Sequence, residues 1–216
     1  MTIAINWPLV QLPSWPAPRT IEYRMQNIVG FTKSPFTAQR QGYNWGQGWW
    51  EWSVAYPPMM ENLAENWIAF LMSCIGTTNV FQLGDPLKTS PRGSGSGAPY
   101  VNGLCPSGTY VLTTSGWTPN AMGVLLPGDY LQIGYRLYRY SGVVPLNADS
   151  SGNATIPIWP PIREVPNGGQ TSPPDFDSIV LNNCTGLWRL KSNSQQFMLD
   201  YDQWYKQLTF EVEEAL

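Results

Sequence analysis

The 216-residue sequence contains no histidine, and only 12% of its residues are charged. Histidine is the commonest general base at neutral pH, so its absence excludes the histidine-dependent hydrolase triads and the commonest zinc sites. The 12 basic side chains form no run longer than two residues, and the net charge is -3. We therefore expect no specific nucleic-acid binding, because no row of cations is present to neutralise phosphates.

Long apolar runs and cysteines are also scarce. The first ten residues lack a positive segment followed by an apolar stretch, and no run reaches membrane-spanning length, so we expect synthesis in a cytoplasm and no membrane partner. Cys74, Cys105 and Cys184 lie far apart and lack metal-ligand spacing. Buried thiols are the preferred interpretation, with a disulfide or a reactive thiol as the alternative. No metal or cofactor is expected.

Glycine, proline and aromatic residues are abundant instead. The chain has 20 glycines and 20 prolines, and 13% of its residues are aromatic. Disordered chains are poor in aromatic residues and rich in charge, so this composition favours a folded, turn-rich, all-β protein. One amphipathic helix is expected at residues 58–75, between Pro58 and Gly76, because apolar residues recur there at intervals of three and four. A single helix of this pattern must lie across a sheet.

Local patterns predict the other elements of the first part of the chain. Alternation of apolar and polar residues predicts strands at 19–29 and 49–56. Glycines at 42, 46 and 48 predict a hairpin loop over residues 42–48 that exposes aromatic rings. Four prolines between residues 6 and 18 predict an extended arm that lies on another surface.

Two segments rich in glycine, serine and proline, 91–99 and 166–174, are typical of flexible connections. Short strands with tight turns lie between them, and these predict a small, OB-like β-barrel. We therefore expect a barrel at residues 88–172, inserted into a discontinuous β domain of residues 1–87 and 173–216. The expected strands are 108–113, 130–133, 136–143 and 153–158 in the barrel, and 79–83, 178–183, 187–191, 197–201 and 207–212 around it, with 178–183 paired to 187–191.

Carboxylate pairs are the first test for an enzyme. Asp200 and Asp202 flank Tyr201, and on a strand their carboxylates would lie on one face at a spacing that glycosidases use. Such alternation is more often a solvated strand face. We therefore expect no catalytic residue, and a glycosidase is only the third alternative for the function.

The eleven tryptophans have three interpretations: core packing, stacking on carbohydrate, or contact with another subunit. For Trp45, Trp49 and Trp50 we favour subunit contact, because interface cores are enriched in aromatic residues and depleted of charge. Trp7 and Trp15, on the proline-rich arm, are assigned to the same contact.

Several segments, in this order along the chain, resemble a family of bacteriophage and prophage tail proteins. They are Phe36-Thr-Ala-Gln-Arg-Gln, Trp50-Glu-Trp, Tyr56-Pro-Pro-Met, Trp67-Ile-Ala-Phe-Leu, Phe81-Gln-Leu-Gly-Asp-Pro, Gly128-Asp-Tyr-Leu-Gln-Ile-Gly and Asp149-Ser-Ser-Gly-Asn-Ala-Thr-Ile-Pro-Ile-Trp-Pro-Pro-Ile-Arg-Glu. The similarity spans about residues 30 to 215 and is greatest to the distal tail proteins of long-tailed phages.

The resemblance implies a virion structural protein without catalytic residues, assembled in the cytoplasm of a bacterial host. Its tail-tube-like β-sandwich or split-barrel domain would form a hexameric ring that joins the tail tube to the tail tip or baseplate and lines the DNA channel, with the barrel projecting outward. The implied partners are copies of the chain, the tube protein and the tail hub or tip.

The strand face of Gln207, Thr209 and Glu211 is the candidate channel lining, because an acidic or neutral lumen lets DNA pass. Two alternatives remain: another tail ring or adaptor protein, and a carbohydrate-binding module for host adhesion. In the second, the barrel would contact glycan through Tyr135, Tyr138, Tyr140 and Trp159.

Overall fold

The computed structural model describes residues 8–162, 176–199 and 204–215. A six-stranded sheet, in the order β1-β5-β12-β15-β3-β2, organises one part of the molecule. Its strands are β1 Leu9–Val10, β2 Thr20–Lys33, β3 Arg40–Ala55, β5 Val80–Gly84, β12 Thr185–Leu190 and β15 Thr209–Glu214. β1 is parallel to β5, and the other neighbours are antiparallel. The all-β fold class is confirmed.

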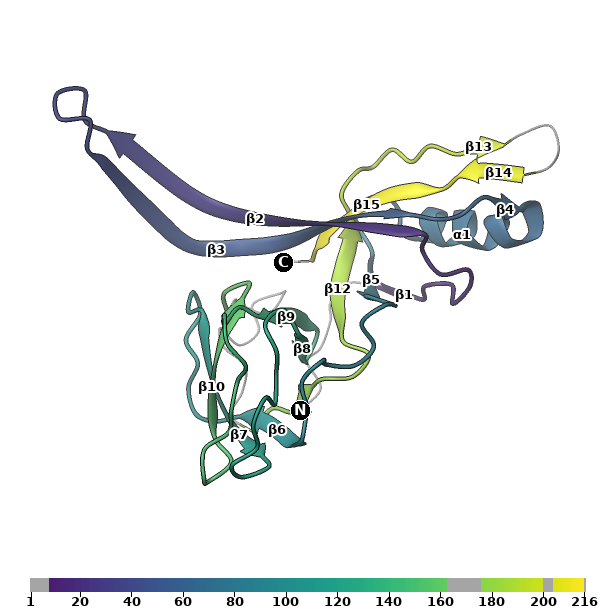
Figure 1. Cartoon of the computed structure of the whole chain (residues 1–216). Coiled ribbons are helices and arrows are strands. Elements are labelled where there is room, and N and C mark those ends of the chain that lie inside the picture. Colours follow the sequence, from purple (N-terminus) through teal and green to yellow (C-terminus); the bar gives the residue numbers. More distant parts are fainter. Residues whose placement is uncertain (1–7, 163–175, 200–203, 216) are drawn as a thin grey trace.

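One face of this sheet is apolar and is covered by the helix α1, Glu61–Ser73 (Figure 1). Within β15, Phe210 and Val212 are buried, and the alternate residues Thr209, Glu211 and Glu213 are only half-buried. From the helix, Trp67 packs near Phe210, and the ring of Phe70 meets Phe81 edge-on with the centroids 5.0 Å apart. The amphipathic stripe in the sequence therefore predicts the helix and its position correctly.

The ends of α1 show where tertiary pairing overrides the local signal. Met59 and Met60 form strand β4, which pairs with β14, Trp204–Gln207, so the helix begins at Glu61 and not at Pro58. β13, Met198–Leu199, completes this three-stranded sheet. At the other end, Gly76 has a φ of 62°, the left-handed conformation expected of a closing glycine.

The second six-stranded sheet, β11-β8-β9-β10-β7-β6, curls into a nearly closed barrel. Its strands are β6 Gly97–Val101, β7 Val111–Trp117, β8 Tyr130–Ile133, β9 Arg136–Tyr140, β10 Ala154–Trp159 and β11 Ile179–Val180. A bridge between Tyr100 and Ser178 joins the two ends of the sheet. The strands expected at 130–133 and 136–143 form a hairpin that turns at Gly134, with β8 and β9 paired from Tyr130–Arg139 to Ile133–Arg136.

Two boundary predictions are wrong. Residues 91–99 are not a loose connection: a Cβ on Gly93 would lie 2.5 Å from the carbonyl oxygen of Val124, so this glycine is required by close backbone packing. Residues 178–183 do not pair with 187–191, because β11 pairs with β8 of the barrel. The barrel therefore includes a strand that we had placed in the surrounding domain, and the chain returns to the first sheet only at β12.

Residues 42–48 are not a hairpin loop either. β2 and β3 pair from Thr20–Ala55 to Lys33–Arg40, so the turn lies at residues 34–39 and the glycine-rich segment is part of β3. The glycines serve a bulge in the strand, where the register shifts between Asn27 and Val29 and Gly46 adopts a φ of 65°. The resulting hairpin reaches well beyond the rest of the sheet and past the barrel (Figure 1).

Candidate assembly surfaces

The face of the first sheet opposite α1 is polar. Alternation along the strands places on it residues from four neighbouring strands, and the strand register sets Arg24 beside Glu51 and Glu51 beside Glu213. The polar residues of this face are Glu22, Arg24 and Gln26 of β2, Glu51 and Ser53 of β3, Thr209, Glu211 and Glu213 of β15, and Arg189 and Lys191 at the end of β12.

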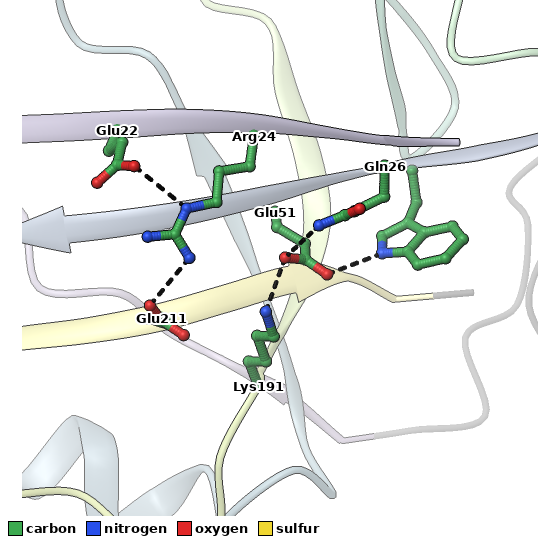
Figure 2. A network of polar contacts seen from close by, with 7 residues as sticks. Glu22, Arg24, Gln26, Glu51, Lys191 and Glu211 are labelled. Carbon is green, nitrogen blue, oxygen red and sulfur yellow. Dashed lines mark hydrogen bonds and ion pairs between the residues drawn. The ribbon is translucent and has the colours of Figure 1, made fainter. Parts of the chain in front are cut away.

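Two carboxylates collect most of the contacts on this face (Figure 2). Glu51 accepts from the Lys191 ammonium at 2.7 Å, the Gln26 amide at 3.1 Å and the Trp49 indole at 3.2 Å. The second, Glu211, accepts from the Arg24 guanidinium at 3.2 Å. Contacts therefore run across β2, β3, β15 and the end of β12, and they fix the relative positions of these strands.

The network also sets the protonation state of Glu51. Burial disfavours the charged carboxylate, but the hydrogen bonds from Lys191, Gln26 and Trp49 outweigh it, so the pKa of Glu51 lies below its ordinary value. The described polar face carries four carboxylates (Glu22, Glu51, Glu211 and Glu213) and three cations (Arg24, Arg189 and Lys191), an excess of one negative charge. Arg24 and Lys191 are ion-paired within it.

The predicted channel residues lie partly on this face. Glu211 and Thr209 are on it and half-buried. The backbone of Gln207 lies in β14, beside Met198, and its side chain falls outside the described part of the structure.

The projecting hairpin of β2 and β3 forms a second surface, and it is rich in exposed apolar side chains. Phe36 at the turn is 95% exposed, and Phe31 is 60% exposed with the Arg40 guanidinium 3.9 Å from its ring centre. The other exposed apolar residues of this hairpin are Met25, Ile28, Val29, Tyr43 and Trp45. Isolated two-stranded hairpins are marginally stable in water. Exposed apolar surface of this kind is typical of an interaction site.

The tryptophans predicted to meet another subunit divide between surface and interior. Trp45 is 68% exposed, as expected, and Trp49 is half-buried beside Glu51. Trp50 is buried, so its assignment to a subunit contact is wrong. Alternation along β3 puts it on the apolar face, where the barrel covers it: its indole donates to the carbonyl of Leu137 and meets the Trp159 ring edge-on at 4.3 Å.

The proline-rich arm lies on the chain's own helix. The Trp15 carbonyl accepts a hydrogen bond of 3.1 Å from the Trp67 indole, which leaves the Trp15 ring exposed. Residues 10–15 and α1 together line a shallow groove. Trp7 lies outside the described residues.

The barrel aromatics do not form a sugar-binding platform. Tyr138 and Tyr140 are each 3% exposed, because their strand β9 turns them into the barrel core, so the predicted glycan contact is wrong for both. Trp159 donates to Asn27 and packs on Trp50, and Tyr135 packs against residues of the first sheet. These two side chains join the barrel to the sheet.

A buried ion pair, which sequence reasoning missed, strengthens this junction. Arg136 of β9 contacts Glu214 of β15 at 3.2 Å, and less than a tenth of either side chain is exposed. Arg136 also donates to the carbonyl of Ala215. No local pattern indicates a pair whose members are 78 residues apart.

The described residues offer little reactive chemistry. They contain no cluster of three or more His, Cys, Asp or Glu side chains that could hold a metal ion. The three cysteines are free and buried, as expected, and burial raises the pKa of Cys74 to about 11 and that of Cys184 to about 12. Asp200 and Asp202 lie outside the described residues.

None of the helices in the described ranges has the length and apolarity needed to cross a bilayer. Comparison of the chain with models of protein families and with curated proteins gives no match.

Proposed function

We propose that the chain is a structural subunit of a phage tail, most similar to the distal ring that joins the tail tube to the tail tip or baseplate. The observation that carries the proposal is the projecting hairpin β2–β3. Its exposed apolar side chains favour contact with a protein partner. The segments that resemble phage tail proteins favour a phage tail as the assembly.

A second copy of the chain is the partner that best fits this hairpin. Among the described strands, β2 lies at the edge of its sheet with no partner on its outer side, and unpaired edges invite association. Closed rotational symmetry lets each subunit cover the exposed hairpin of its neighbour, which leaves none uncovered. A charged fraction of only 12% fits a surface that is buried on assembly. Following the resemblance, we propose six copies.

In this ring the polar face of the first sheet lines the channel and α1 lies outside. The face opposite α1 has an excess of one negative charge among its described residues, and two of its three cations, Arg24 and Lys191, are ion-paired. A surface of this kind does not hold the DNA backbone and lets it pass. The tube protein on one side and the tail hub or tip on the other are the further partners, and assembly takes place in the cytoplasm of the bacterial host.

Variants at the hairpin test the proposal. In sedimentation experiments the wild-type chain should form a particle of six times 24.2 kDa. Replacing both Phe31 and Phe36 by serine should weaken this assembly by roughly tenfold or more, because buried aromatic side chains are common hot spots of interfaces. The fold should survive, since both rings are exposed in the subunit.

Met122→Ser is the matched control, because Met122 is 80% exposed but lies in the barrel, away from the hairpin. It should assemble like the wild type. Equal assembly of the double variant and the wild type would refute the role of the hairpin, as would a wild-type chain that stays monomeric at every concentration.

A further inference from the structure

A pocket of about 270 Å³ opens on the barrel, close to its junction with the first sheet. Three cationic side chains and one tyrosine dominate its lining: Lys88, Arg92, Arg139 and Tyr130. The segment after β5 contributes Lys88 and Arg92, and the β8–β9 hairpin contributes Tyr130 and Arg139. Two buried carboxylates, Asp85 and Asp129, lie beside these cations, and Asp129 also lines the pocket.

Both carboxylates are already occupied by donors of the chain. Asp129 accepts from the backbone of Arg92, Gly93 and Leu126, and it also pairs with the Arg92 side chain at 3.3 Å. Asp85 accepts from the Tyr23 hydroxyl at 2.7 Å and from the backbone of Leu87 at 2.9 Å. Their hydrogen-bonding capacity is therefore used to fix loops. Their two negative charges offset part of the charge of Lys88, Arg92 and Arg139, which leaves an excess of one positive charge.

The donors of the pocket are in excess. The Lys88 ammonium makes no hydrogen bond to the described residues, and its nearest carboxylate oxygen, on Asp85, is 4.0 Å away. Arg139 donates through Nε to the carbonyl of Gly128, and within the described chain its two terminal nitrogens have no acceptor. The Tyr130 side chain is 4% exposed, and its hydroxyl lacks a partner among the described residues. A buried polar group in this state costs free energy until a partner arrives.

Lys88 and Arg139 carry like charges, line the same pocket and lie near the same tyrosine ring. The ring of Tyr130 lies against both, with its centre 5.3 Å from the Lys88 ammonium and 4.7 Å from the Arg139 guanidinium. Burial lowers the pKa of Lys88, and the positive charge of Arg139 lowers it further, against the smaller opposing effect of the Asp85 carboxylate. An anion between the two cations would relieve this repulsion and accept their unused hydrogen bonds.

We propose that this pocket binds a small oxyanion, a phosphate group, through Lys88 and Arg139. Phosphate offers several acceptor oxygens around one centre and forms strong charge-assisted bonds with both ammonium and guanidinium groups. The phosphate is either a free ion or the phosphate of a sugar that enters the pocket. The site lies on the barrel and not on the hairpin, so the proposal of a phosphate site does not depend on the proposal of a ring.

Calorimetric titration of the full chain tests the site. Inorganic phosphate is one ligand, glucose 1-phosphate is the second, and sodium chloride of equal ionic strength is the reference. The wild type should bind phosphate, and Lys88→Gln should bind it roughly tenfold or more weakly, the usual effect of losing a charge-assisted hydrogen bond. This variant should fold, because the Lys88 ammonium makes only a 4.0 Å ion pair with Asp85, and that carboxylate keeps its hydrogen bonds from Tyr23 and Leu87.

Lys33→Gln is the matched control, because it removes a lysine from the hairpin end of β2 and should leave phosphate binding unchanged. Tighter binding of glucose 1-phosphate than of phosphate would support the site and assign it to a sugar phosphate, and the reverse order would support it as a site for the free ion. Absence of binding to both ligands, or equal binding by Lys88→Gln and the wild type, would overturn the proposal.

Discussion

At the scale of single residues, Glu51 is the most heavily used acceptor on the polar face. Its side chain is 9% exposed and receives three donors, so it is charged in the folded protein and compensated on all sides. Charge-assisted hydrogen bonds of this type are worth about 1.5 to 3 kcal/mol each when one partner is removed. The partner Lys191 is 35% exposed, so the lower end of this range applies.

We predict that Glu51→Gln lowers the free energy of unfolding by about 1.5 kcal/mol at neutral pH. The pKa of Glu51 is lower in the folded protein than its ordinary value of 4.5, so ionised Glu51 stabilises the fold above that pH. This stabilisation is lost as the pH falls through the depressed folded-state pKa, and the wild type and the variant should then converge. Urea unfolding at a series of pH values from neutral to strongly acidic measures the difference.

Glu22→Gln provides the comparison, because Glu22 lies on the same face but its side chain is 62% exposed. It should change stability by less than about 0.5 kcal/mol at every pH. A cost of Glu51→Gln that remains undiminished in strong acid would show that the carboxylate charge is not its source.

At the scale of elements, the junction between barrel and sheet depends on a few side chains from β3, β9, β10 and β15. Trp50 packs against Trp159, and the Arg136–Glu214 pair is buried next to them. Such a pair is costly to break on one side only, because the remaining charge stays buried without its counter-charge.

We predict that Arg136→Met alone destabilises the protein by about 3 to 5 kcal/mol, and Glu214→Leu alone by a similar amount. The double variant should cost clearly less than the sum of the two, because it leaves no uncompensated charge. Chemical unfolding of the four proteins in this cycle measures the coupling. Strict additivity of the two single changes would contradict the account of the junction.

The elements also show how far the sequence alone leads. The stripe of α1 and the alternation of β15 each follow from a local period, so both were predicted correctly. The glycines of β3 suggested a loop, because one sequence does not reveal that a partner strand extends alongside them to Arg40. The pairing of β11 with β8 likewise depends on residues distant in sequence, so the predicted pairing of residues 178–183 with 187–191 is wrong.

The same limit applies to the candidate surfaces. Trp45 is exposed because it lies on the projecting hairpin. Trp50 is buried because the barrel covers it, and the barrel meets β3 only in the folded chain. Tyr138 and Tyr140 were misplaced because their position on a strand does not say which side of the barrel is the inside. Which face of a strand is buried is a property of the whole fold.

At the scale of the whole molecule, three features have separate places. The helix covers one face of the first sheet, the polar network lies on the other face, and the apolar hairpin extends away from both (Figures 1 and 2). In a closed ring these become an outer wall, a channel lining and a contact with the neighbouring subunit. The barrel, with the proposed phosphate pocket, forms none of these three parts of the ring.

The most direct test is a cryo-electron microscopy reconstruction of the assembled wild-type particle. We predict a six-fold ring in which the face of Glu51 and Glu211 lines the channel, α1 lies on the outside and the β2–β3 hairpin contacts the adjacent subunit. A ring with α1 toward the channel, or with unpaired basic side chains lining it, would contradict the account.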